Sequence, residues 1–375
     1  MTGTPLALDR EHFLAEYWQK KPLLIPCALP DFTPPVGPDE LAGLAMEEGI
    51  ESRIVENRDQ QWLLHQGPFE AEDLRRKTPW TLLVQAVDHY LPEVAVLRQY
   101  FDFIPQWRVD DVMVSYAEDG GSVGPHFDNY DVFLLQGAGQ RLWRVGQQCD
   151  ESTPLLPHED LRILADFDCS DEYLLGPGDM LYLPPGVAHW GIAQGECTTF
   201  SIGFRAPRVN DMLSRWADTA LTLLPADRFY QDGGITTEAR PGEIREDAIS
   251  RAQQQLLDAI DTLDIASWFG ELVTEPRYSI EPSPDAEAEL ESLAEPGKRL
   301  NLSPEAKVAW QQRAEHIIAY ANGESAQFSL KALPALLVLC ETWRLQGDEL
   351  AAACEHGRGR DLLSFLLQSG AVYVE

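Results

Sequence analysis

The middle of the chain has the hydrophobic pattern of short β-strands. Between about Arg108 and Arg205, runs rich in β-branched and aromatic residues are separated by Gly and Pro. Several strands at this spacing are typical of an all-β sandwich or barrel. The turn formed by residues 176–179 (GPGD) separates two apolar runs and predicts a hairpin or a corner. The preceding hundred or so residues mix helical stretches with isolated extended runs such as Pro22–Pro26.

Beyond Arg205 the pattern becomes helical. Apolar residues recur at three- and four-residue spacings in Asp211–Leu224 and Glu246–Leu263, as in amphipathic helices. Ser303, followed by Pro304 and Glu305, has the features of a helix start. We therefore predict four parts: a barrel with N-terminal helices (1–205), a helical region (206–275), an acidic, Pro-rich linker (276–300) and a small winged-helix-like domain (301–375).

The charge balance limits the classes of partner. The 375 residues include 29 Lys+Arg and 61 Asp+Glu, a formal net charge of −32. Such a surface repels nucleic-acid phosphates and attracts cationic partners. The winged-helix-like part carries six Lys/Arg against nine Asp/Glu, whereas a DNA-reading domain needs a basic stripe. We expect no direct DNA binding.

The six cysteines are scattered and form no C-x-x-C pair, which fits a reducing compartment. The N-terminal sequence lacks a basic segment followed by an apolar one, and no run reaches the length of a membrane span. We therefore expect a soluble, cytoplasmic protein with no membrane association.

Three residues have the chemistry of a metal site. His126 and Asp128 follow a Gly-rich turn, and strand alternation would place both with Tyr130 on one face. His189 follows a Pro-Pro-Gly turn further along. Two imidazoles and one carboxylate on a β-barrel form the facial triad of non-haem Fe(II) oxygenases. A metal-dependent cupin is the rival interpretation, but its usual ligand set has a glutamate in place of Asp128.

An Fe(II) oxygenase that uses 2-oxoglutarate needs a cation for the distal carboxylate of that cosubstrate. Arg141, at the start of the run RLWRV, can supply a bidentate guanidinium. The alternative is an ordinary surface arginine at a strand end.

Four motifs together resemble the JmjC-type ribosomal oxygenases. They are EHFLAEYWQKKPLLIPCALP, GGSVGPHFDNYDVFLLQGAGQRLWRVG, LLGPGDMLYLPPGVAHWG and TTFSIGFRAP, and they occur in order over much of the chain. The resemblance implies a mainly β fold with α-helices: a JmjC double-stranded β-helix, which is a cupin-like jelly-roll barrel, then a helical dimerisation region and a C-terminal winged helix. A homodimer is implied as well.

The resemblance also implies roles for particular residues. His126, Asp128 and His189 would bind Fe(II), and Arg141 would bind 2-oxoglutarate, with O2 as the second cosubstrate. Ser115 either contacts the cosubstrate or only packs. The substrate pocket maps to Asp111, Met113, Tyr130 and Ser201; alternation puts Asp111, Met113 and Ser115 on one strand face. Met113 and Tyr130 could instead fill the barrel core.

The implied activity is that of an arginine 3-hydroxylase acting on a basic protein of the large ribosomal subunit. An acid and an aromatic ring are suited to a guanidinium guest. Three alternatives remain open at this point: a histidyl hydroxylase of a ribosomal protein, a cupin enzyme without 2-oxoglutarate, and a non-catalytic JmjC scaffold or regulator.

Overall fold

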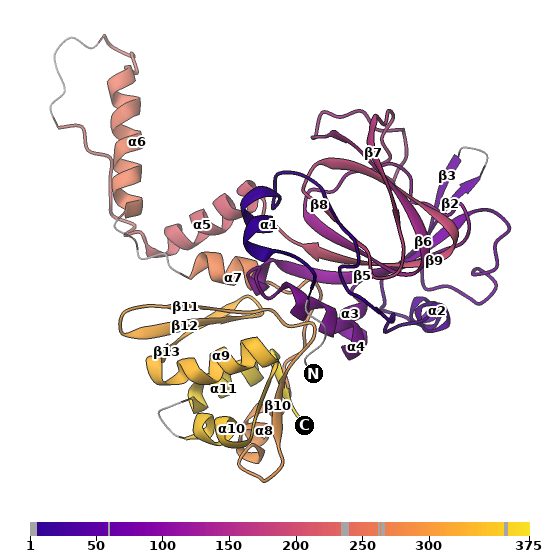
Figure 1. Cartoon of the computed structure of the whole chain (residues 1–375). Helices are drawn as coiled ribbons and strands as arrows, with labels where there is room; N and C mark the ends of the chain where they lie inside the picture. The colour runs from indigo at the N-terminus through magenta and orange to yellow at the C-terminus, as the bar shows by residue number, and fades with distance from the viewer. Residues whose placement is uncertain (1–5, 59–60, 234–239, 262, 264–266, 356–358) are drawn as a thin grey trace. The chain divides into compact units, whose positions relative to one another are not determined.

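The computed structural model describes residues 6–58, 61–233, 240–261, 263, 267–355 and 359–375. The chain divides into two compact units, Met1–Ala206 and Pro207–Glu375, which are described separately (Figure 1). None of the described helices is both long and apolar enough to cross a membrane.

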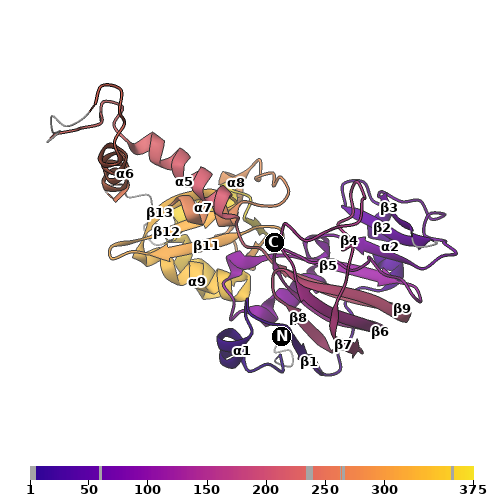
Figure 2. The ribbon, with the colours of Figure 1, turned by 90° about the horizontal axis from the view of Figure 1, so that it is seen from above.

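The first unit is built on one antiparallel sheet of nine strands, which confirms the predicted β-barrel (Figure 2). Strands β6 and β9 are the longest, and the register shifts between Gln136 and Ala138 interrupt their regular pairing. In sheet order the strands are β1 (Leu23–Ile25), β8 (Met180–Leu183), β6 (Asp131–Gln148), β9 (Val187–Phe204), β5 (Val109–Ala117), β4 (Trp80–Val84), β2 (Ser52–Arg58) and β3 (Gln61–Gln66), with β7 (Cys169–Leu175) paired to β6.

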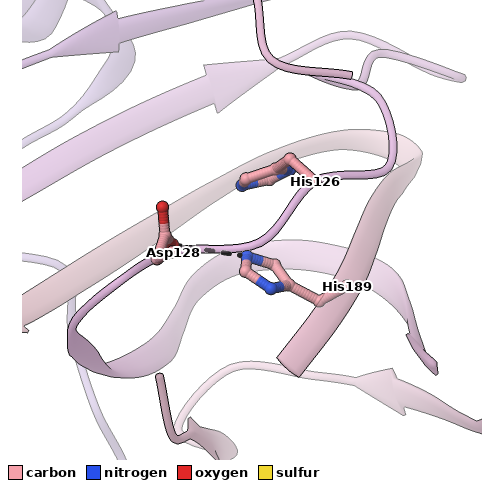
Figure 3. A group of neighbouring side chains, drawn as sticks. All are labelled: His126, Asp128 and His189. Carbon is pink, nitrogen blue, oxygen red and sulfur yellow. Dashed lines mark ion pairs between the residues drawn. The ribbon is translucent and has the colours of Figure 1, made fainter. Parts of the chain in front are cut away.

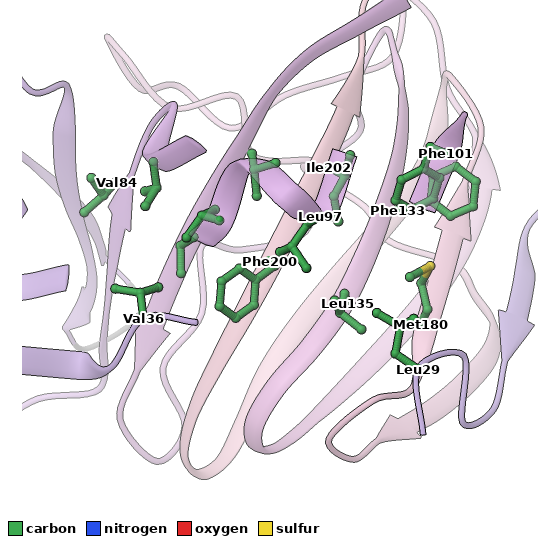
Figure 4. Packing of buried hydrophobic residues seen from close by; sticks show 14 of the residues in the cluster. Leu29, Val36, Val84, Leu97, Phe101, Phe133, Leu135, Met180, Phe200 and Ile202 are labelled. Carbon is green, nitrogen blue, oxygen red and sulfur yellow. The ribbon is translucent and has the colours of Figure 1, made fainter. Parts of the chain in front are cut away.

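Side-chain alternation divides the residues of these strands between two environments. In β6, Phe133 and Leu135 belong to the main hydrophobic core (Figure 4). Their neighbours Val132 and Leu134 belong to a second cluster and line a cavity. The main core also receives buried residues from the helices that precede β5: α1 (Arg10–Glu16), α2 (Pro38–Met46), α3 (Val87–Tyr90), α4 (Pro92–Ala95) and the 3-10 helix η1 (Val96–Phe101), with the 3-10 turn η2 (Gln106–Arg108) leading into β5.

The prediction that a regular strand carries the H-x-D motif is wrong. His126 makes only an isolated bridge, Asp128 and Tyr130 lie outside strands, and β6 begins at Asp131. Pro125 lacks the N–H that a regular ladder needs, and Gly124 has a φ of +83°. The runs HFDNYDVFLLQ and RLWRVG, which the Gly-containing stretch between them predicts as separate strands, both contribute to the single strand β6.

The second unit contains both predicted amphipathic helices, α5 (Val209–Leu223) and α6 (Glu246–Asp261). Helix α7 (Trp268–Thr274) follows. Within the range expected as a linker, α8 (Ala286–Ser292) buries Leu290 in the hydrophobic core of this unit, so this stretch is part of the folded unit. The sequence predicts a linker here because a short helix rich in acidic residues has the same composition as a linker.

The predicted helix start at Ser303 is also wrong. Ser303 N–H donates to Ala371 O at 2.9 Å, and the chain turns into strand β11 (Val308–Gln312). Sheet partners therefore outweigh the local helix signal. The remaining elements are β12 (His316–Ala321) and β13 (Glu324–Ser329), which pair with β11; β14 (Arg344–Gln346), β10 (Arg299–Leu302) and β15 (Val372–Val374), which form a second small sheet; the 3-10 turn η3 (Leu330–Ala332); and helices α9 (Leu333–Thr342), α10 (Gly347–Cys354) and α11 (Arg360–Gln368).

Glu56 of β2 holds the stretch that leads into β4 from a buried position. Its side chain is only 1% exposed and accepts hydrogen bonds from Arg58 and Arg76, both at 2.9 Å, and from Thr78. Burial raises the pKa of Glu56, but the bonds from Thr78, Arg58 and Arg76 outweigh it and lower the pKa from 4.5 to about 2. The carboxylate therefore stabilises the fold fully above pH 4.5, and this stabilisation is lost as the pH falls toward 2.

We predict that Glu56→Gln lowers the free energy of unfolding by about 3 kcal/mol at neutral pH, since each pKa unit corresponds to about 1.4 kcal/mol. Urea unfolding at a series of pH values measures this. The difference from the wild type should shrink below pH 4.5, whereas exposed Glu93→Gln should have almost no effect. A difference that does not change with pH would contradict this role.

Candidate metal centre and its cavity

Two of the three predicted ligands are joined through their main chains. His126 N–H donates to His189 O at 3.0 Å, and His189 N–H donates to His126 O at 2.8 Å. Gly186 N–H donates to Asp128 O at 2.7 Å. The segment that carries His126 and Asp128 thus lies antiparallel to the beginning of β9. The structure brings the three residues together by this pairing, although no regular strand carries the H-x-D motif.

The turn before His126 is packed so closely that it needs glycine. At Gly124, whose φ is positive, a Cβ atom would lie 3.2 Å from the Trp62 ring and 3.3 Å from Ile163. The Ser122 hydroxyl accepts hydrogen bonds from Gly124 N–H at 3.1 Å and from the Trp190 indole N–H at 2.8 Å. These contacts fix the turn against β9 and so determine the position of His126.

The three side chains point toward a common centre (Figure 3). One ligand atom of each of His126, Asp128 and His189 lies within 4.8 Å of the others, and His189 Nε2 is 3.6 Å from Asp128 Oδ2. His126 Nδ1 lies 2.9 Å from Gly124 O, and His189 Nδ1 lies 3.0 Å from Val187 O. Because a carbonyl only accepts, each Nδ1 carries the proton and each Nε2 keeps its lone pair for a metal.

His189 is prepared to act as a neutral ligand. Its side chain is 3% exposed, and burial, together with the nearby His126, lowers its pKa from 6.5 to about 4, although Asp128 and the Val187 carbonyl act in the opposite direction. At neutral pH the imidazole is therefore deprotonated, as metal binding requires. The donor set of two imidazole nitrogens and one carboxylate fits Fe(II) and leaves positions for cosubstrates.

A cavity of about 480 Å³ adjoins the triad. Its walls come from alternate residues of strands β2 to β6 and β9, from the segment at 123–130 and from the loop at 160–163. Arg141 lies in this wall and is 5% exposed, so it is not an ordinary surface arginine. Its Nη1 donates to Ser115 Oγ at 3.3 Å. Ser115 therefore orients the guanidinium.

The same wall holds buried hydrogen-bond donors with no protein partner. Arg141 Nε and Nη2, Trp143 Nε1 and Thr81 Oγ1 have none among the described residues, and all three side chains line the cavity. Buried polar groups are normally satisfied, and a buried guanidinium needs an anion. A carboxylate bound here would satisfy them, so this chain's residues fit the distal carboxylate of 2-oxoglutarate.

Three of the four residues expected in the substrate pocket line the cavity: Met113, Tyr130 and Ser201. Asp111 does not line it; the residue is buried, and its carboxylate accepts a hydrogen bond from Gln85 Nε2 at 2.7 Å. Tyr130 is 41% exposed and lies at the cavity mouth. The negative charge of Asp128, burial, and the charge of Asp111 raise the pKa of Tyr130 well above its ordinary value, so the phenol stays protonated.

Sequence reasoning did not find several cavity residues. Trp143 lies two positions after Arg141 on β6, so strand alternation was a usable signal for it. Thr81, Arg53 and Gln66 come from β2 to β4, far from the motifs. Only the sheet order brings these three beside the triad.

Comparisons with protein-family models agree with this architecture. The model of the JmjC domain matches residues 96–212, which include the triad, and the model of the ROXA-like winged helix matches residues 255–373. The winged-helix match begins well before residue 301, in keeping with the folded helix α8. A model of the AraC-like ligand-binding domain matches residues 170–271.

Similar proteins extend the likeness to the whole chain. The Ribosomal protein uL16 3-hydroxylase of Escherichia coli is 34% identical over 99% of both chains. A probable ribosomal oxygenase of Haemophilus influenzae is 36% identical over 85% of this chain and 82% of its own. A solved structure of the ribosomal oxygenase YcfD from Escherichia coli, in complex with cobalt and 2-oxoglutarate, has a TM-score of 0.85 at 33% identity, covering 99% of both chains.

We predict that His189→Ala weakens Co(II) binding by more than about 100-fold, because loss of groups that only support a ligand already costs 10- to 100-fold. Isothermal titration calorimetry with Co(II) measures this. His12→Ala, which removes an exposed histidine of α1, should leave the affinity unchanged. Equal Co(II) affinities in both variants would show that the metal binds elsewhere.

Proposed function

Because the chain belongs to the JmjC-type ribosomal oxygenases, which use a metal and 2-oxoglutarate, we propose that it hydroxylates an arginine of the large-subunit ribosomal protein uL16 at carbon 3. The observation that carries the proposal is that the triad, Arg141 and the expected substrate residues line one cavity. One wall presents the triad and the unsatisfied donors around Arg141, and Met113, Tyr130 and Ser201 leave room beside them for a second molecule.

When bound, Fe(II), 2-oxoglutarate and O2 supply the oxidising power of the reaction. The protein residues do the positioning. His126, Asp128 and His189 hold the metal, with both imidazoles oriented by carbonyl oxygens. Arg141, held by Ser115, fixes the far end of the cosubstrate. Holding the reactants at fixed orientation accounts for much of the rate gain in such reactions.

The pocket chemistry favours a guanidinium over an imidazole. Tyr130 lines the cavity with an aromatic ring, a group suited to bind a cation, and Met113 and Ser201 line the same space. Asp111 lies close enough to raise the pKa of Tyr130, so its carboxylate adds negative charge behind the pocket. The alternative is a histidyl hydroxylase of a ribosomal protein, which differs from the proposed enzyme in the side chain that gains oxygen.

The net charge of −32 suits a basic ribosomal protein as substrate, because long-range attraction speeds encounter. An enzyme with this substrate would work in the cytoplasm, where ribosomal proteins are made. A scaffold without catalysis would have no use for an intact triad with unsatisfied donors beside it.

The test is mass spectrometry of a uL16 peptide incubated with the enzyme, Fe(II), 2-oxoglutarate and O2. We expect a gain of one oxygen on arginine, no gain with His126→Ala, and a 2-oxoglutarate requirement raised at least about tenfold with Arg141→Ala, which loses a charge-assisted pair. Oxygen on histidine would favour the histidyl hydroxylase, full activity of Arg141→Ala without 2-oxoglutarate would favour the cupin enzyme, and no turnover at all the scaffold.

The homodimer is a further part of the proposal, and helices α5 and α6 support it. Large apolar side chains on both are exposed, among them Leu213 (62%) on α5 and Leu256 (63%) and Leu257 on α6. Within α6 only Ala259 is buried. An amphipathic helix whose apolar face stays exposed among the described residues is suited to pair with a second copy.

We predict that wild-type enzyme sediments with twice the mass of one chain, and that Leu256→Glu with Leu257→Glu sediments as a monomer, because the charges would be buried in the interface. Asp258→Lys, which changes the charge by as much at an exposed position on the opposite side of the same helix, is the matched control and should remain dimeric. A variant that stays dimeric would exclude this face of α6.

A further inference from the structure

The free edge of strand β3 lies beside the cavity. This strand is the last in the sheet order, and among the described residues β2 is its only partner strand. The side chains of Leu64 and Gln66 line the cavity that holds the triad. The sheet that forms the cavity wall therefore ends in an edge that borders the reaction site.

The direction of the main-chain groups of β3 follows from its neighbours. In an antiparallel pair, alternate residues bond to the partner strand and the residues between them point away. Asn57 N–H, in β2, donates to Pro79 O on the β4 side, and Gly67 N–H donates to Ser52 O of β2. With Ile54 opposite His65, these bonds place the odd-numbered residues of β3 against β2.

The even-numbered residues of β3 consequently present N–H and C=O groups to the free edge. An independent contact agrees, because His158 Nε2 lies 3.2 Å from the carbonyl oxygen of Trp62, which must point outward for this bond. Among the described residues, the outward groups of Leu64 and Gln66 have no hydrogen-bond partner. The edge is thus covered at Trp62 and open from Leu64 to Gln66.

We propose that an extended segment of the protein substrate adds to this edge as a further strand, pairing with Leu64 and Gln66. Residues opposite each other in a ladder share a face, so every second side chain of the added strand would face into the cavity. The strand would lie about 4.8 Å from β3. Main-chain bonds would supply affinity, and the cavity would select the side chain that enters.

This inference rests on the proposed function, which requires a protein segment at the cavity mouth. The exposed cavity residues Gln66, Tyr130, Asp160 and Arg162 mark that mouth, and Gln66 belongs to the open edge itself. A segment that inserts a side chain here and passes Gln66 runs beside β3. A basic ribosomal segment also suits the net charge of −32. A second copy of this chain is the rival occupant.

The first test changes only the substrate. A series of uL16 peptides, each with one backbone N-methyl group, is compared with the unmodified peptide on wild-type enzyme. We expect KM to rise about tenfold at every second residue and by less than about twofold between, since each blocked N–H loses one hydrogen bond and adds a clash. Tolerance at all positions, or losses without a two-residue period, would overturn edge pairing.

The second test changes the enzyme. Leu64→Pro removes the outward N–H but no bond to β2, because the N–H of Leu64 points away from β2. Proline is tolerated at such edge positions. Leu64→Ala loses the side chain and keeps the N–H, so it is the matched control. We expect KM for the peptide to be at least about fivefold higher with proline than with alanine. Equal KM values in variants with the same unfolding temperature would contradict the proposal.

Two other outcomes are informative. If Leu64→Pro changes the sedimenting mass and not KM, a second copy of the chain occupies the edge and the proposal is overturned. If the unmodified peptide gains no oxygen in the presence of Fe(II) and 2-oxoglutarate, the proposed function fails first, before the N-methyl series is measured.

Discussion

The reciprocal pair of hydrogen bonds between the main chains of His126 and His189 is the constraint on which the site depends. Asp128 and His189 are 61 positions apart in the sequence. They reach one centre because the two hydrogen bonds hold the irregular segment against β9. The other end of the segment is fixed by the buried carboxylate of Asp131. It accepts hydrogen bonds from Tyr182 at 2.6 Å and from Arg108 at 2.9 Å.

The barrel separates stability from chemistry by strand alternation. Outward residues such as Phe133 and Phe200 build the main core, and the inward residues that alternate with them line the cavity. Because the core does not use the cavity residues, the inner wall can hold unsatisfied donors such as Arg141 Nε without loss of the main hydrophobic contacts. The cost of those buried donors is recovered when an anion binds them.

The barrel, the long helices and the grouping of His126, Asp128 and His189 could be predicted from local pattern and resemblance. The irregular segment at His126 could not, because the motif has the alternation of a strand and the bridge depends on β9. The turn at Ser303 was misjudged because its bond to Ala371 is a long-range contact. Thr81 and the β3 edge were missed for the same reason, since sheet order decides what lies beside the triad. The sequence predicts Asp111 in the cavity, but this residue does not line it, and its carboxylate accepts a hydrogen bond from Gln85.

In the proposed reaction, one oxygen atom of O2 is inserted into a C–H bond of the substrate arginine and the other is retained in succinate. The most direct measurement is turnover of a uL16 peptide under isotopically heavy dioxygen in ordinary water, with both products weighed by mass spectrometry. We expect one heavy oxygen in the hydroxyarginine and one in the succinate. A hydroxyl that carries only ordinary oxygen, and therefore comes from water, would contradict the proposed reaction.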